Sequence, residues 1–228
     1  MQTPLLHRRD VVAALVQDRG DMLVVSGLGS PTYDLMAAGD HDLNYYLWGA
    51  MGGAAMIGLG LARTNPDRSV LVVTGDGEML MGMGSFATIA VQAPKNLTIA
   101  ILDNGYYGET GMQLSHSGRG VKLEMVAQSV GFDWVSRITS MDAVADLRRR
   151  IQAKDSVNCA AIAIDSGEID RVLPSRDGVY IKNRSKDGRF CWVFAVATPT
   201  DDGYLSGLRD ICDRVGTLLV FDCVQTGI

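Results

Sequence analysis

Two apolar runs without polar alternation constrain the fold of this chain more than any other feature. They are Val70 to Thr74 and Leu97 to Leu102, and both are rich in β-branched residues. Runs of this kind predict parallel strands that are buried on both faces. The residues between them, Glu78 to Gln92, are long enough for a crossover helix that ends before Pro94. The segment therefore predicts one βαβ unit.

Each predicted strand ends at a polar turn, Gly75-Asp76-Gly77 after the first and Asp103-Asn104-Gly105 after the second. In a βαβ unit both turns lie at the carboxyl edge of the sheet, where open α/β sheets bind ligands. Asp76 offers a carboxylate oxygen and Asn104 an amide oxygen, and the following bend turns a main-chain carbonyl, most simply that of Tyr106, toward them. Three such oxygens, with waters and phosphate oxygens, suit an octahedral Mg²⁺.

The glycines of the first turn predict a phosphate group beside this metal. Gly75 and Gly77 let the backbone approach a diphosphate, and the helix that follows presents unpaired N–H groups to its charge. Either turn alone is as compatible with an ordinary bend as with a site. Their joint placement after two buried strands favours a metal-bound diphosphate.

Length and composition restrict the class of protein. A chain of 228 residues, 47% of them hydrophobic and 21% charged, suits one α/β domain with or without an appendage. The net charge of −5 and the lack of a long basic run argue against a nucleic-acid partner. No apolar stretch approaches the roughly 20 residues of a membrane helix, so no membrane partner is expected. Four cysteines without C-x-x-C spacing, and no apolar leader, predict a cytoplasmic protein with reduced thiols.

The motif GDG, followed by Asn104 at 28 positions after Asp76, resembles the thiamin-diphosphate signature, which begins with GDG and ends in a paired asparagine. The similarity covers most of residues 1–184, including GLGSPTYDL, LWGAMGGAAMIGLGLA, NLTIAILDNGYYGETGMQLSHSGRG and LPSRDGVYIKNR. Among thiamin-diphosphate-dependent 2-oxo acid decarboxylases, the chain is most similar to the beta subunit of sulfopyruvate decarboxylase and to the matching half of phosphonopyruvate decarboxylase.

This resemblance implies an α/β fold, a three-layer α/β/α arrangement doubly wound around a mainly parallel sheet. The diphosphate-binding domain would occupy residues 1–184, and residues 185–228 would form a C-terminal extension of uncertain structure. Phe190 to Ala197 and Leu218 to Phe221 are strand-like, and Tyr204 to Val215 has helical spacing. Both an extension of the fold and a foreign or frame-shifted end are compatible with this segment.

The resemblance also implies roles for the residues of the two turns. It makes Asp76, Asn104 and the Tyr106 carbonyl the ligands of Mg²⁺. The backbone from Gly75 through Gly77 to Glu78 would contact the diphosphate. Glu78 stands where relatives often carry serine, so a hydroxyl contact to phosphate is lost or replaced here.

Further implied contacts come from earlier in the chain. Gly29 and Ser30 would approach the diphosphate, although a Gly-Ser-Pro loop that opens a helix explains them nearly as well. The Gly49 carbonyl would accept from the 4-amino group of the aminopyrimidine, and the Met51 side chain would bend the cofactor. His116 either handles protons or is merely a solvated loop residue.

Small residues recur every four positions at Ala50, Ala54, Gly58 and Ala62. This spacing on a helix predicts a close approach of another backbone. That backbone belongs either to the sheet beneath the helix or to a partner chain.

The implied reaction is that of a lyase, the decarboxylation of 3-sulfopyruvate to sulfoacetaldehyde and carbon dioxide. In this family the activating glutamate lies on a separate pyrimidine-binding domain, and only 47 residues precede Trp48. We therefore expect half of an active site, in a hetero-oligomer whose partner subunit brings the glutamate, with no certain catalytic residue in this chain. Alternatives are a phosphonopyruvate decarboxylase, an acetolactate-synthase-like carboligase, a non-catalytic nucleotide-binding module and an inactive remnant.

Overall fold

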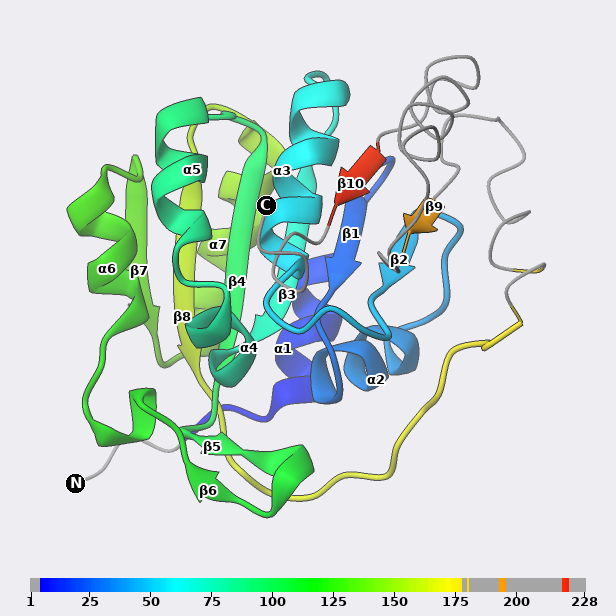
Figure 1. Cartoon of the computed structure of the whole chain (residues 1–228), viewed down its shortest axis with the longest axis vertical. Helices are drawn as coiled ribbons and strands as arrows, with labels where there is room; N and C mark the ends of the chain where they lie inside the picture. Colours follow the sequence, from blue (N-terminus) through cyan, green and yellow to red (C-terminus); the bar gives the residue numbers. More distant parts are fainter. Residues whose placement is uncertain (1–4, 178–179, 181–192, 196–218, 222–228) are drawn as a thin grey trace, which may run out of the picture. The chain divides into compact units, whose positions relative to one another are not determined.

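A computed structural model describes residues 5–177, 180, 193–195 and 219–221 (Figure 1). The chain divides into two compact units, Met1–Pro174 and Ser175–Ile228. The first unit contains a six-stranded sheet in the order β2-β1-β3-β4-β8-β7, in which all neighbouring strands are parallel. Its strands are β1 (Leu23–Ser26), β2 (Asn44–Tyr46), β3 (Val70–Gly75), β4 (Leu97–Asp103), β7 (Trp134–Ile138) and β8 (Asn158–Ala163).

Helices cover both faces of this sheet (Figure 1). One face carries α1 (Arg8–Val16), α2 (Ser30–Ala37) and α7 (Met141–Ala153). The other face carries α3 (Ala54–Thr64), α4 (Asp76–Met81), α5 (Ser85–Gln92) and α6 (Leu123–Val130). The predicted doubly wound α/β fold is therefore confirmed.

The core forms because the central strands bury both of their faces. Every residue of β1, β4 and β8 is buried, as is β3 up to its last glycine. On one face these strands meet the apolar stripe of α7, formed by Val144, Leu147 and Ile151, and the stripe of α1. Each such side chain contributes roughly 1.5–3 kcal/mol when fully buried. The sheet is consequently a rigid base for the loops at its carboxyl edge.

The predicted crossover helix is divided in two, which corrects the expectation of one helix from Glu78 to Gln92. Helix α4 ends at Met81 and α5 begins at Ser85. The division occurs where Gly82 meets another backbone, because a Cβ atom there would lie 2.2 Å from the carbonyl oxygen of Gly52. The close approach leaves no room for a side chain at this point.

Helix α3 begins at Ala54, later than the small-residue pattern suggested, and Ala50 lies outside it with a φ of 54°. Within the helix, a Cβ atom on Gly58 would lie 2.2 Å from Cγ2 of Val72 in β3. For Gly58 the small residue therefore allows a close approach of the sheet, which was one of the two expected alternatives.

Short elements follow β4 and precede α6. Strands β5 (Tyr106–Tyr107) and β6 (Gln113–Leu114) form an antiparallel pair, with the 3₁₀ turn η1 (Gly108–Thr110) between them. A second 3₁₀ turn, η2 (Ser117–Arg119), comes next. Figure 1 shows β5 and β6 below α4, and β5 contacts this helix, which directly follows β3.

In the second unit the structure describes a parallel pair of strands, β9 (Val193–Ala195) and β10 (Leu219–Phe221). Both fall within stretches that are strand-like in sequence. The predicted helix from Tyr204 to Val215 lies outside the described residues. No helix in the described part of the chain is long and apolar enough to cross a membrane.

Candidate functional site at the carboxyl edge of the sheet

The strand order places a topological switch point between β1 and β3. The chain leaves β1 toward α2 on one face of the sheet and leaves β3 toward α4 on the other. Open α/β sheets bind ligands in the crevice between loops that diverge in this way. Residues 27–30 and 75–78 form these loops here, so the predicted GDG turn lies where the fold favours a ligand.

Asp76 is the first residue of α4, and only 2% of its surface is exposed. Its Oδ2 atom accepts hydrogen bonds from the hydroxyls of Ser115 at 2.5 Å and Ser117 at 2.6 Å. Both serines come from the segment that follows β6. A burial this complete is unusual for a charged side chain, and the two hydroxyls partly offset its cost.

A second carboxylate, that of Asp103, lies beside Asp76. In the register of the sheet, Gly75 pairs with Leu102, and each aspartate directly follows one member of this pair, Asp76 in α4 and Asp103 at the end of β4. The Ser117 hydroxyl that contacts Asp76 also lies 2.7 Å from Oδ1 of Asp103. The other oxygen of Asp103 pairs with the guanidinium of Arg137 on β7.

Burial raises the pKa of Asp76 above its ordinary value. The hydrogen bonds from Ser115 and Ser117 oppose this rise, and the negative charge of Asp103 adds to it. A buried carboxylate next to a like charge is stabilised in its ionised form by a nearby cation. The donor set of this site, which consists of hard oxygens, therefore fits a divalent metal.

Asn104 and Tyr106 form the turn after β4. The side-chain oxygen of Asn104 accepts the backbone N–H of Tyr106 at 2.9 Å, which fixes its orientation within the turn. An amide oxygen has two lone pairs, so this bond leaves one acceptor position. Gly105 has a φ of +76°, and a Cβ atom there would lie 3.2 Å from the backbone of Gly118. The turn is thus held against the segment that carries the two serines.

The aromatic ring of Tyr107 covers the GDG turn. A Cβ atom on Gly77 would lie 2.6 Å from two carbons of this ring, so the close approach requires glycine. The Tyr107 hydroxyl lies 3.3 Å from Nδ1 of His116. His116 therefore contacts the residue that covers the turn, and a role in proton transfer remains a prediction.

Glu78 is turned inward, and only 4% of its surface is exposed. Its Oε2 atom accepts the backbone N–H of Leu28 at 2.9 Å and the hydroxyl of Thr74 at 3.0 Å. Burial raises the pKa of Glu78, and these hydrogen bonds oppose the rise. The side chain thus joins the loop after β1 to the end of β3.

The remaining predicted contacts lie in the loops at the same edge. Gly29 precedes α2 with a φ of +69°, and Ser30 is the first residue of that helix. Gly49 and Met51 lie in the connection between β2 and α3, and 42% of the Met51 surface is exposed. Their contacts with a cofactor stay predictions.

Several residues of this site were not singled out from the sequence. They are Thr74, Asp103, Tyr107, Ser115, Ser117 and Arg137. The S-x-S pattern of Ser115 and Ser117 was the available signal, but only the folded chain brings it to Asp76. Within the described residues, no group of three or more His, Cys, Asp or Glu side chains forms a metal site, so the candidate site is a mixed set of oxygens.

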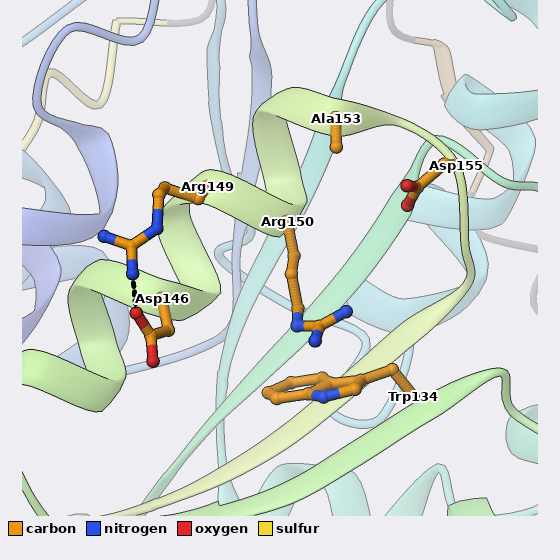
Figure 2. Close-up of a pocket in the computed structure, with 6 residues that line it drawn as sticks. All are labelled: Trp134, Asp146, Arg149, Arg150, Ala153 and Asp155. Atoms are coloured by element: carbon orange, nitrogen blue, oxygen red, sulfur yellow. Dashed lines mark hydrogen bonds and ion pairs between the residues drawn. The ribbon is translucent and has the colours of Figure 1, made fainter.

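A surface hollow of about 540 Å³ lies elsewhere, where α7 ends and β7 begins (Figure 2). Figure 2 shows Arg150 over the ring of Trp134, with the guanidinium carbon 4.7 Å from the ring centroid. Arg149 pairs with Asp146. The hollow lies at the amino edge of the sheet, opposite the switch point, and Asp155 accepts the Ser156 hydroxyl there. We assign it no ligand.

Comparison with known proteins gives the family. The model of the family "Thiamine pyrophosphate enzyme, C-terminal TPP binding domain" matches residues 29–164. The chain is 35% identical over 164 residues to a sulfopyruvate decarboxylase of Methanosarcina acetivorans, covering 72% of this chain and 42% of that protein. It is 40% identical to the sulfopyruvate decarboxylase subunit beta of Methanocaldococcus jannaschii, covering 57% of this chain and 69% of that subunit.

A phosphonopyruvate decarboxylase of Streptomyces viridochromogenes is 41% identical over 66% of this chain and 37% of that protein. The chain thus spans less than half the length of the Methanosarcina and Streptomyces relatives. Among solved structures, the thiamin diphosphate-dependent 4-hydroxybenzoylformate decarboxylase of Rhodococcus jostii RHA1 has the same fold, with a TM-score of 0.58. It is 19% identical and covers 74% of this chain and 34% of that chain. This chain therefore belongs to the thiamin pyrophosphate enzyme family, and residues 29–164 contain its C-terminal cofactor-binding domain.

Proposed function

We propose that this chain is the diphosphate-binding subunit of a thiamin-diphosphate-dependent 2-oxo acid decarboxylase. The proposed reaction converts 3-sulfopyruvate to sulfoacetaldehyde and carbon dioxide. The observation that carries the proposal is the buried Asp76 carboxylate, which lies beside Asp103 at the switch point and within the region that matches the family. The relatives named sulfopyruvate decarboxylase support this substrate.

The residues at the carboxyl edge would divide the binding of the cofactor among them. Asp76, Asn104 and the Tyr106 carbonyl would hold Mg²⁺, and the backbone of Gly75 to Gly77 would lie against the diphosphate. When bound, thiamin diphosphate supplies a sink for the electron pair left behind as carbon dioxide departs. The Tyr107 ring, which already covers Gly77, would keep water from this end of the site.

The loops before the GDG turn would complete the binding surface. Gly29 and Ser30 are supported as diphosphate contacts by their position in the loop after β1, at the switch point. Gly49 and Met51 would contact the aminopyrimidine through a carbonyl and a side chain, respectively. The exposure of Met51 supports this role, since an apolar side chain at a binding edge is available to a ligand.

A partner subunit would complete the active site. We propose a pyrimidine-binding-domain subunit that brings the activating glutamate, in a hetero-oligomer. The chain spans 42% of the Methanosarcina relative but 69% of a relative that is itself named a beta subunit, which supports a site divided between two chains. Exposed methionines near the site edge, Met51, Met81 and Met112, support contact with another protein.

Two further proposals concern the chain as a whole. Residues 1–184 would form the cofactor-binding domain, with 185–228 as an extension. The location would be cytoplasmic, which the free buried thiol of Cys159 supports.

A phosphonopyruvate decarboxylase is the second candidate, favoured by the Streptomyces relative at 41% identity. Sulfonate and phosphonate groups are both tetrahedral anions, so the two substrates present similar shapes with different charges. The two candidate enzymes would differ in the residues that contact the sulfonate or phosphonate group on the third carbon of the substrate.

The test is a decarboxylation assay with the full chain and the product of its neighbouring reading frame. The mixture should contain Mg²⁺ and thiamin diphosphate, and each of 3-sulfopyruvate, 3-phosphonopyruvate and pyruvate should be tried separately. We expect aldehyde and carbon dioxide from 3-sulfopyruvate, and no turnover when Asp76→Asn replaces the wild-type chain. Preferred turnover of phosphonopyruvate would favour the second candidate, and acetolactate from pyruvate would favour a carboligase. No turnover by a complex that has bound cofactor would contradict both.

A further inference from the structure

The Glu78 carboxylate spans the switch point but contributes no ligand to the proposed metal site. Its Oε2 atom accepts from the Leu28 amide and from the Thr74 hydroxyl. Leu28 follows β1, whereas Thr74 lies in β3. One carboxylate oxygen therefore connects the loop after β1 to β3, across the switch point.

The fit between Glu78 and Gly27 is close. A Cβ atom on Gly27 would lie 1.7 Å from Oε2 and 2.8 Å from Cδ of Glu78, so the position requires glycine as long as Glu78 is present. The Gly27 peptide is also held to the sheet, since its N–H donates to the Val73 carbonyl and its carbonyl accepts the Thr32 hydroxyl, both at 2.7 Å. Glu78 accepts the N–H of the peptide group whose carbonyl bonds to Thr32, so both ends of this peptide are fixed.

Helix α4, whose first turn carries Glu78, also meets the connection that follows Met51. At the other end of this helix, a Cβ atom on Gly82 would lie 2.2 Å from the Gly52 carbonyl oxygen. Helix α4 is therefore held between the loop after β1 and the connection between β2 and α3.

Burial of the Glu78 carboxylate lowers the free energy of unfolding if the side chain only fills space. Within the described residues no Lys, Arg or His pairs with Glu78, and its Oε1 atom is buried without a hydrogen-bond partner of normal geometry. A buried carboxylate that neutral donors alone support loses more solvation than an apolar side chain of similar size. What the carboxylate offers in return is a fixed position for the Leu28 N–H and, through it, for the loop after β1.

We propose that Glu78 is a positioning residue that holds the 27–30 loop against the Gly75–Gly77 turn, in the geometry that a diphosphate requires. The inference rests on the proposed function, because it concerns the same cofactor. It gives the Glu78 side chain a role in place of the hydroxyl contact to phosphate, which the sequence predicts to be lost or replaced here. A site that is ordered before binding loses less conformational entropy when the ligand enters.

The test measures two properties of the full chain for each variant. One is the dissociation constant of thiamin diphosphate at saturating Mg²⁺, by calorimetry, and the other is the unfolding midpoint without cofactor. For Glu78→Ala we expect the dissociation constant to rise about tenfold or more, and for Thr74→Val, which removes one donor and keeps the shape, about threefold. For Glu78→Gln, which keeps the volume of the side chain, we expect a rise in the dissociation constant between those of the other two variants. Thr74→Val and Glu78→Gln keep the proposal testable if Glu78→Ala fails to fold.

Glu124→Gln is the matched control. Glu124 is also a buried carboxylate with an unpartnered oxygen, but it lies on α6, where its charge acts on Cys159 of β8. We expect this variant to shift the unfolding midpoint while leaving the dissociation constant unchanged.

A double-mutant cycle with Gly27→Ala tests the contact directly. In the wild-type chain the new methyl group would displace the Glu78 carboxylate, so the variant should bind cofactor as weakly as Glu78→Ala. In the Glu78→Ala background the same change should add little, because most of the clash is gone.

The outcomes separate the two proposals. If wild-type protein binds Mg²⁺ and thiamin diphosphate but the Glu78 variants bind equally well and lose only stability, Glu78 is structural and this inference is wrong. Additive effects in the double-mutant cycle would also overturn it. If the wild-type chain itself does not bind thiamin diphosphate, the proposed function fails and the inference fails with it.

Discussion

Ser115 and Ser117 make more oxygen contacts than they have hydroxyl protons to donate. Oxygen contacts of 2.5 to 2.8 Å join these two hydroxyls to each other, to Asp76 and to Asp103. Each hydroxyl has only one proton to donate, so four close oxygen contacts share two protons. The Arg137 guanidinium offsets the charge of Asp103, and a divalent cation would offset that of Asp76. The deficit supports a metal site without depending on sequence similarity.

Ser117→Ala tests this interpretation at the residue scale. The change removes the shared donor between two carboxylates, so we expect the metal-free protein to lose about 1–3 kcal/mol of unfolding free energy. Mg²⁺ with thiamin diphosphate should then raise the unfolding temperature more in the variant than in the wild type, since the cation replaces the missing donor. Thermal unfolding in chelator and in saturating ligand measures both quantities.

Ser129→Ala is the control for this comparison, because the Ser129 hydroxyl is exposed and bonds only to the Val126 carbonyl. It should leave the ligand-induced shift unchanged. An equal shift in Ser117→Ala and wild type would show that the hydroxyl and the cation do not act at the same place.

Cys159 gives a prediction that does not involve the cofactor. Burial raises the pKa of the Cys159 thiol, and the charge of Glu124 raises it further, so almost no thiolate is present at neutral pH. In a variant with Cys191→Ser, Cys212→Ser and Cys223→Ser, a thiol reagent at pH 8 should react with no thiol in the native protein. One equivalent should react after denaturation. Rapid labelling of the native variant would place Cys159 at an accessible surface instead.

Sequence reasoning reached some of these residues and missed others for a definite reason. Asp76 and Asn104 were predictable because each directly follows a buried strand, so local pattern fixes their edge of the sheet. Ser115 and Ser117 reach Asp76 from 39 and 41 positions away, in a loop whose path no local pattern specifies. The inward direction of Glu78 was missed because it depends on Leu28, 50 positions earlier.

Among the elements, the long regular ones were predictable and the short ones were not. Helix α7, Met141–Ala153, is predictable from sequence because its buried residues Val144, Leu147 and Ile151 recur with helical period. Strands β2 and β7 were not identified, since β2 has three residues and β7 is a half-exposed edge strand. The division between α4 and α5 depends on the tertiary contact of Gly82 with Gly52, which helix periodicity does not report.

Gly58→Ala tests the packing of α3 on the sheet. The added methyl group would overlap Cγ2 of Val72, so the variant should lose about 1–3 kcal/mol of unfolding free energy in spite of the better helix propensity of alanine. Gly84→Ala, where a Cβ atom meets nothing within 4 Å, is the control and should be neutral or slightly stabilising. Denaturant unfolding measures both. A stable Gly58→Ala variant would mean that α3 lies farther from β3 than described.

For the whole molecule, family membership reduces the number of functions that are compatible with the sequence. A match to the cofactor-binding domain over residues 29–164 favours a catalytic subunit over a nucleotide-binding module. The module predicts tight binding of a nucleotide such as ATP, and the present account predicts that thiamin diphosphate binds far more tightly.

The proposed division of the active site gives a prediction at this scale. The chain alone should bind thiamin diphosphate with Mg²⁺ yet show no decarboxylation, because the activating carboxylate would come from the partner. Adding a pyrimidine-domain partner should restore turnover, and replacing the partner's activating glutamate by glutamine should remove it without dissociating the complex. Activity of the isolated chain would contradict the proposed division, and size-exclusion chromatography would report whether the complex persists.

The most direct test of the central claim is the position of a bound metal. Crystals of the chain grown with Mn²⁺ in place of Mg²⁺ and with thiamin diphosphate should show an anomalous signal at the carboxyl ends of β3 and β4. We predict the ion within about 2.0–2.3 Å of an Asp76 carboxylate oxygen, the Asn104 amide oxygen and the Tyr106 carbonyl, and bonded to the diphosphate. An ion or a diphosphate located elsewhere, with Asp76 still bonded only to Ser115 and Ser117, would contradict the account.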